Sequence, residues 1–295
     1  MQPLIAWLVA RPQNAVIALV ATLLLPLLKV VSGIIMVLLV LRQGVVRAAL
    51  EGLAAGALLA VVAAIAGGPA VQVATAVATT WLPAVALAAM LQYTRSLTLT
   101  LQVAVLLAAS ATAVLHAAVP DPVAWWQPVM DQLLDWARQN NLQQQADLME
   151  SEPAMTANMM TMAMVLSSWS LYAIYLLLGY RASEALPGTS RNFGRFLDLN
   201  FGRVIALMTA VLATLAAASG AAWLQGTAFV LFAVFWLQGL AVLHWMYAAG
   251  VVPLFVVIIT YVLLPVLHVF LMLALAMLGY TDAWFRFRRR AAKQI

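Results

Sequence analysis

The sequence predicts an all-α fold: a polytopic bundle of transmembrane helices with about ten membrane segments, short or broken at both ends of the chain. Apolar residues make up 65% of the 295 residues and charged residues only 8%, and the mean hydropathy is +1.00. A bilayer favours this composition, because hydrocarbon accommodates apolar side chains but does not solvate charges. The apolar stretches run from end to end, so we expect residues 1–295 to form a single integral membrane domain.

The acidic and basic residues lie in different segments of the chain. Most of the acidic residues lie in segment 120–152, whereas arginines gather in the loop 181–203 and in the tail 285–295. Because basic loops stay on the cytoplasmic side during insertion, the loop and the tail are predicted to be cytoplasmic and 120–152 external. This topogenic pattern explains the net charge of +5, and no nucleic-acid partner is expected.

A proline and a lysine divide the first apolar stretch. Pro26 and Lys29 separate two short segments, 15–25 and 31–41, because proline removes a helix hydrogen bond. Each segment is short for a full crossing, so a re-entrant hairpin is a second interpretation. Longer segments that can cross as single helices follow at 48–66, 71–91, 97–118 and 154–180.

The acidic segment 120–152 is predicted to contain an amphipathic helix at the membrane surface. Its apolar positions recur at helical spacing, and polar residues occupy the other side: Trp126, Val129, Met130, Leu133, Leu134 and Ala137 against Asp131, Gln132, Asp135, Arg138 and Gln139. The tryptophan pair at its start is typical of a membrane interface. A lid over an outward-facing cavity is the second interpretation, in which Trp126 contacts a ligand.

The C-terminal part is assigned by counting crossings. If the loop 181–203 and the tail share one side, an even number of crossings must separate them. The apolar blocks between them are odd in number, but the last, 251–284, would be about 51 Å long as one helix. Pro265 lies near its middle and breaks it. We therefore predict two segments there, 251–264 and 266–283.

No catalytic signature is present in the sequence. It has no phosphate-binding glycine loop, no His-Glu-x-x-His and no Gly-x-Ser-x-Gly, the motifs of common ATPases, metalloproteases and serine hydrolases. There are no cysteines, which excludes disulfides and thiolate metal sites. We expect a protein that is not an enzyme, without catalytic residues, cofactor or bound metal.

Two charged residues are candidate ligand contacts. A charge at mid-bilayer costs about 2.5–3.5 kcal/mol, so Lys29 either faces a cavity or snorkels to the nearer surface. Glu51 follows Arg47 by four residues, one helical turn, which predicts a local ion pair. Its carboxylate could instead meet Lys29 or a neighbouring segment. Near the other end of the chain, we expect Asp282 to pair with the basic tail.

Two further patterns concern packing and partners. Small residues recur at every fourth position and predict a closely packed helix: Ala48, Gly52, Gly56, Ala60, Ala64 and Gly68. The loop 181–203 is unusually apolar for a solvated linker. Phe193, Arg195 and Phe196 are its candidate contacts with the membrane or with a partner.

Several stretches resemble known families. Leu41-Arg42-Gln43-Gly44, followed by Glu51-Gly52, resembles the early region of S-components, the substrate-capturing subunits of energy-coupling-factor vitamin transporters. The block 238–244, the ending 278–288 and the loop with Pro187-Gly188, Phe193 and Phe196 resemble the YybS-like family of uncharacterised predicted bacterial membrane proteins.

This resemblance implies a protein of the bacterial inner membrane with an S-component-like core. From the arginine distribution we expect both termini to be cytoplasmic, and from the missing phosphate-binding loop we expect no ATPase in this chain. Lys29, Glu51 and Trp126 would then contact a small-molecule ligand. S-components dock their coupling subunit through small residues on the first helix, for which this chain offers Ala15, Ala18 and Thr22. The alternative function is a non-transporting scaffold or assembly partner for cell-envelope machinery, acting through the loop 181–203. The expected partners are the lipid bilayer, a small molecule and a membrane protein.

Overall fold

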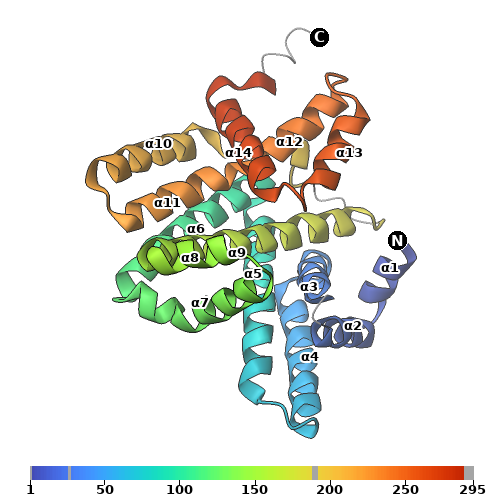
Figure 1. The fold of residues 1–295 in the computed structure, drawn as a ribbon. Helices are drawn as coiled ribbons and strands as arrows, with labels where there is room; N and C mark the ends of the chain where they lie inside the picture. The colour runs from blue at the N-terminus through green and yellow to red at the C-terminus, as the bar shows by residue number, and fades with distance from the viewer. Residues whose placement is uncertain (1, 26–27, 188–191, 289–295) are drawn as a thin grey trace. The chain divides into compact units, whose positions relative to one another are not determined.

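The computed structural model describes residues 2–25, 28–187 and 192–288, and over these residues it contains helices and no strand. Figure 1 shows the helices along the chain. This confirms the predicted all-α, polytopic class. The α-helices are α1 (Gln2–Ala10), α2 (Pro12–Leu24), α3 (Lys29–Gln43), α4 (Val45–Ile65), α5 (Ala70–Thr94), α6 (Leu97–Ala118), α7 (Pro122–Gln139), α8 (Gln143–Ser151), α9 (Pro153–Glu184), α10 (Gly202–Ser219), α11 (Ala222–Ala233), α12 (Phe235–Ala248), α13 (Leu254–Leu263) and α14 (His268–Phe285).

The internal contacts of the chain divide it into two compact units. Unit 1 comprises Met1–Leu101 and Ser170–Phe196, and unit 2 comprises Gln102–Trp169 and Leu197–Ile295. The division falls inside α6 and α9, which contribute residues to both units. The single membrane domain expected from the sequence stays a prediction, and each unit is described by itself.

Seven helices of the described residues are long and apolar enough to cross a membrane: α4, α5, α6, α9, α10, the joined α11 and α12, and α14. The number rises to 8 if α1 and α2, bent by 113°, form one broken span. The predicted count of about ten segments was too high by this measure. The reason is length, because α2, α3 and α13 have 13, 15 and 10 residues, and a core of about 30 Å needs about 20 residues.

The predicted breaks at both ends of the chain are confirmed. One break separates α2, which ends at Leu24, from α3, which begins at Lys29. The other separates α13 from α14 and contains Pro265. A further helix, α1, was not predicted from the sequence; it precedes a sharp bend at Arg11, where Pro12 opens α2. Proline suits that position, since the first residues of a helix need no hydrogen-bond donor.

The core of unit 1 is α3, which packs against α2, α4 and α5. Its middle and later turns are continuously buried. Two glycines let α9 approach α3 closely: a Cβ at Gly33 would overlap the ring of Tyr175, and one at Gly179 would lie 2.6 Å from the Cβ of Val37. Because both contacts join residues at the same sequence offset, α3 and α9 run parallel.

The ladder of small residues packs closely in its first half, as predicted. A Cβ at Gly52 or at Gly56 on α4 would lie 3.8 Å from the indole ring of Trp81 on α5. Met36 of α3 also reaches Gly52. The later members, such as Ala64, are exposed or partly exposed, because a spacing of four residues drifts around a helix that turns every 3.6.

The core of unit 2 is the joined helix α11–α12. Of its most apolar stretch 83% is buried, compared with 22–44% for the other candidate spans. α10 packs along α11, and α14 packs along α12. The last contact is made through Gly239 and Gly279, which leave room for the two backbones to meet. This span is therefore surrounded by protein, whereas its neighbours keep apolar faces open.

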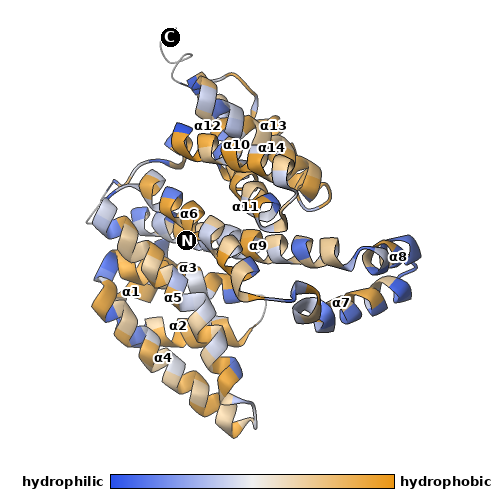
Figure 2. Cartoon of the chain, turned by 90° about the vertical axis from the view of Figure 1, so that its left-hand side faces the viewer, coloured by the Kyte–Doolittle hydropathy of each residue, from blue (hydrophilic) through white to orange (hydrophobic). Residues whose placement is uncertain are grey.

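The acidic segment forms a helical hairpin, α7 and α8, where one surface helix was predicted. The amphipathic division is confirmed, since Met130, Leu134 and Ala137 are buried while the predicted polar side is exposed. The hairpin has a small core of its own, in which Leu134 and Ala137 meet Ala146 of α8. Asp121 caps the start of α7 by accepting from the backbone N–H of Ala124 at 3.0 Å. Figure 2 shows hydrophilic residues along this hairpin, mixed with hydrophobic ones on α7.

Candidate functional site

The core of unit 1 contains a buried carboxylate. Glu51 is 4% exposed in α4, and its Oε1 accepts from the Nε of Arg47 at 3.3 Å. The predicted local ion pair is thus confirmed. Arg47 is half-exposed, so the pair only partly offsets the burial of the carboxylate. The other oxygen, Oε2, is buried and has no hydrogen-bond partner among the described residues.

A hydrogen bond between α3 and α5 lies in the same core. The indole N–H of Trp81 donates to Oγ of Ser32 at 2.8 Å, and both residues are buried. The Trp81 ring also rests against Gly52, the neighbour of Glu51. Thr80, next to Trp81, is buried, and its hydroxyl has no partner in the described part of the chain.

A proline inside α5 exposes one more polar group. Pro83 lacks the N–H that would bond the carbonyl of Thr79 four residues earlier. The hydroxyl of Tyr172 on α9 donates to this carbonyl at 3.0 Å. A side chain from a neighbouring helix thus replaces the missing backbone donor, which is how proline is tolerated in a membrane helix.

Tyr175 completes the cluster on α9. It is fully buried against Gly33, its ring centroid lies 5.9 Å from that of Tyr172, and its hydroxyl has no partner within the described structure. We define the polar core of unit 1 as Ser32, Glu51, Thr80, Trp81, Tyr172 and Tyr175. These side chains provide hydroxyl, indole and carboxylate groups among apolar helices, the chemistry that orients a small polar ligand.

Lys29 does not approach Glu51 as an ion-pair partner. It is the first residue of α3 and is partly buried, whereas the carboxylate of Glu51 pairs with Arg47. A cation at a helix N-terminus meets the positive end of the helix dipole, so this position does not stabilise Lys29. Its role as a ligand contact stays a prediction.

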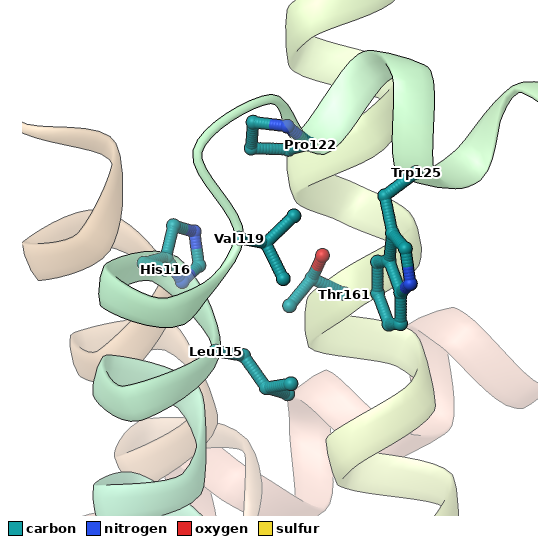
Figure 3. A pocket seen from close by; sticks show the side chains of 6 residues that line it. All are labelled: Leu115, His116, Val119, Pro122, Trp125 and Thr161. Atoms are coloured by element: carbon teal, nitrogen blue, oxygen red, sulfur yellow. The ribbon is translucent and has the colours of Figure 1, made fainter.

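Trp126 belongs to unit 2, so Lys29, Glu51 and Trp126 do not assemble within one unit. Its indole N–H donates to Oγ1 of Thr161 at 2.9 Å. Beside it is a small pocket of about 10 Å³, room for about one water molecule and not for a ligand of ordinary size. Figure 3 shows the lining residues, which are Leu115, His116, Val119, Pro122, Trp125 and Thr161.

Of the predicted partner contacts, Phe193 is buried inside unit 1. Its backbone N–H donates to the hydroxyl of Tyr180 at 3.0 Å, and its carbonyl accepts from the N–H of Leu97 at 2.7 Å. Arg195 is exposed and Phe196 is partly buried. Phe193 therefore anchors the described part of the loop inside unit 1, a structural role that was not among the predictions from the sequence. Residues 188–191 lie outside the described residues.

Most residues of the polar core carry no charge, so the positions of charged residues in the sequence do not indicate them. Ser32, Trp81 and the two tyrosines are uncharged, and each also occurs as an ordinary helix residue. The available signal was Pro83, since a proline in a long apolar helix frees one carbonyl and requires a donor from elsewhere.

A comparison with protein-family models finds a match over most of the chain. The matching family is described as "Predicted membrane protein (DUF2232)", and its model covers residues 14–283. The chain is a member of this family. The match contains the whole polar core of unit 1 and the hairpin of unit 2. No curated protein and no solved structure matches the chain.

Near the end of the family match, the predicted pairing of Asp282 with the tail is confirmed. Asp282 is fully buried, and its Oδ2 accepts from Arg288 at 2.7 Å and from Nε2 of Gln238 at 3.0 Å. Gln238 in turn accepts from the N–H of Phe201 at 2.7 Å. Arg288 also donates to the carbonyl of Leu199 at 2.7 Å. This network joins α12, α14 and the loop before α10; residues 289–295 of the predicted tail lie outside the described structure.

Arginines gather at one pole of each unit. In unit 1, Arg42 at the end of α3 donates to the carbonyls of Ser183 and Pro187, at 3.5 and 3.0 Å. In unit 2, Arg203 at the start of α10 donates to the carbonyl of Trp284 at 3.1 Å. The helix ends that each of these arginines joins therefore lie on the same side of their unit.

Proposed function

We propose that this membrane protein is a binding subunit for a small polar molecule, with an S-component-like core and without an ATPase or catalytic site of its own. The observation that carries the proposal is Glu51, a buried carboxylate with one unpartnered oxygen. An ionisable residue within a membrane segment marks a functional site by default, because placing it there is costly.

The surroundings of Glu51 support a ligand over a purely structural role. Polar groups that lack a partner in hydrocarbon cost several kcal/mol each, and unit 1 also buries the unpartnered hydroxyls of Thr80 and Tyr175. A ligand that carries hydroxyl or amine groups would provide the missing hydrogen bonds. We include Lys29 as a second contact, for an anionic group on the same ligand.

The arginine poles support a location in the bacterial inner membrane. Basic loops remain in the cytoplasm, so the pole at Arg42 and the pole at Arg203 would both face the cytoplasm and the α7–α8 hairpin would face outward. The contact between Arg288 and Leu199 then requires an even number of crossings between them. α10, α11–α12 and α14 supply an odd number, and we propose that α13 with its flanking residues makes the remaining crossing.

Uptake by such a subunit would need a membrane partner that supplies energy. The small residues proposed for docking lie on α2, where Ala15 is fully buried while Ala18 and Thr22 are partly exposed. A coupling subunit would therefore find a narrow surface there. We propose the relationship to S-components and to the YybS-like family on this basis and on the sequence resemblance.

The alternative, a scaffold for cell-envelope machinery, depends on the loop 181–203. Its strongest residue, Phe193, packs against Tyr180 inside unit 1, with the ring centroids 5.7 Å apart. A partner protein would have to contact Arg195 and Phe196 without contacting Phe193. This observation favours the ligand-binding function.

The test is ligand retention by the purified protein. We expect native mass spectrometry of the protein in nanodiscs to reveal a co-purifying small molecule, and a metabolite screen to find compounds that raise the melting temperature. Glu51→Gln should abolish both effects, whereas Glu150→Gln on the exposed hairpin should retain them; Lys29→Ala would test the second contact.

Two outcomes would contradict the proposal. In the first, no compound binds the protein or raises its melting temperature. In the second, a ligand raises the melting temperature of Glu51→Gln as much as that of the native protein. Crosslinking of a specific protein through residues 192–203 in native membranes, together with an absence of ligand, would support the scaffold.

A further inference from the structure

The hairpin carries an apolar edge distinct from its buried face. Trp125, Val129 and Trp136 of α7 are 46%, 44% and 54% exposed. At 3.6 residues per turn they fall within about 40° of arc around the helix axis. They therefore lie along one side of the helix, with Gln132 between Val129 and Trp136, and we call these three residues the tryptophan edge.

Most of the apolar face that the sequence predicts to lie on the membrane is already occupied by protein, and Val129 is its exposed member. Trp126 bonds to Thr161 of α9, and Leu134 and Ala137 pack against α8. This face therefore has little left to offer to lipid. The tryptophan edge lies beside it on the helix.

The charged residues occupy the remaining part of α7. Asp131 and Asp135 are exposed and lie about 140° and about 100° from the centre of the tryptophan edge. The helix surface is thus divided into a sector that faces protein, an apolar edge, and a sector suited to water. A helix with three such sectors fits a line where protein, lipid and water meet.

We propose that the tryptophan edge rests in the headgroup layer of the membrane that α6 and α9 cross. The hairpin is continuous with both spans: α6 ends at Ala118, just before α7, and α9 begins at Pro153, just after α8. Both connections are short, so the hairpin starts and ends at the membrane boundary. Tryptophan is enriched at this boundary because its ring is apolar and its N–H is polar.

The absence of cysteine from the sequence allows a direct test. Single spin labels would be placed at Val129→Cys and Trp136→Cys on the edge, and at Asp131→Cys and Asp135→Cys as matched controls on the same helix. The full-length protein would be reconstituted into vesicles of phosphatidylethanolamine and phosphatidylglycerol. Collision rates with oxygen, which concentrates in lipid, and with a water-soluble nickel chelate would then be compared.

We expect the oxygen-to-nickel collision ratio to be several-fold higher at the edge positions than at the aspartate positions. Equal ratios at all four sites would overturn the proposal and leave the edge as a surface for a protein partner. All four native residues are exposed, so the labels should not disturb folding. Because no other protein is present in the vesicles, a high ratio at the edge can come only from lipid or from contact with another copy of the chain. Dilution to one copy per vesicle separates these two sources. Loss of the high ratio on dilution would also overturn the proposal.

Discussion

Trp81 and Ser32 are joined by a hydrogen bond of 2.8 Å in the interior of unit 1. The bond links α5 to α3, and the same indole ring packs on α4 through Gly52 and Gly56. One side chain therefore fixes the relative placement of three helices around the candidate ligand site.

Breaking this bond should lower the stability of the protein by a measurable amount. We expect Ser32→Ala to reduce the free energy of unfolding by about 1–2 kcal/mol, because the indole N–H is left buried without an acceptor. A double-mutant cycle with Trp81→Phe, measured by unfolding in detergent, should give a coupling near 1 kcal/mol. Ser167→Ala, at an exposed site on α9, is the matched control; a coupling of zero would contradict the assignment.

The crossing of α12 and α14 should not tolerate a methyl group. A Cβ at Gly279 would lie 2.7 Å from the backbone nitrogen of Gly239, and one at Gly239 would overlap the carbonyl of Leu275. Since backbone atoms cannot rotate away, Gly239→Ala or Gly279→Ala should cost about 3 kcal/mol or more. Gly56→Ala, where the added Cβ meets only ordinary contacts, should be neutral or slightly stabilising. Equal melting temperatures for all three variants would refute this packing.

The buried ion pair of unit 2 predicts a rescue experiment. Arg288→Ala should destabilise the protein by about 3–5 kcal/mol, because it leaves the charge of Asp282 buried and unpaired. Adding Asp282→Asn should recover part of this loss. Arg181→Ala, which breaks an exposed pair with Glu184, should cost less than about 1 kcal/mol. If the double variant is as unstable as the sum of the single ones, the two side chains are not coupled.

The pairing of Pro83 with Tyr172 predicts a second rescue. Tyr172→Phe removes the donor to the carbonyl of Thr79 and should cost about 1 kcal/mol. In a Pro83→Ala background the helix regains its own N–H, so the same tyrosine change should then cost close to nothing. Unfolding measurements on the four proteins of this cycle test the idea, and an equal cost of Tyr172→Phe in both backgrounds would rule it out.

Local rules predicted the features that depend on neighbouring residues. The proline breaks, the ion pair of Glu51 with Arg47 and the amphipathic pattern of α7 follow from spacing along one helix. The pairing of Asp282 with the tail was also accessible, since Arg288 is only six residues away.

The features that depend on distant contacts could not be predicted. The sequence does not show that Tyr172 meets Thr79, because these residues are 93 positions apart. Apolar periodicity also could not show that Trp126 donates a hydrogen bond to Thr161 while the neighbouring Trp125, which lines the pocket, stays 46% exposed. The number of spans was overestimated because apolar content does not determine helix length.

The proposed topology requires the arginine-bearing ends to share the cytoplasmic side of the membrane, and single-cysteine labelling tests this directly. Asp198→Cys in the loop, Phe287→Cys in the tail and Glu150→Cys in the hairpin are all at exposed positions, in a chain without other cysteines. With a membrane-impermeant maleimide on intact cells, we expect only the hairpin site to react, and the other two to react after the cells are opened. Labelling of Phe287→Cys in intact cells while Asp198→Cys stays protected would contradict the account.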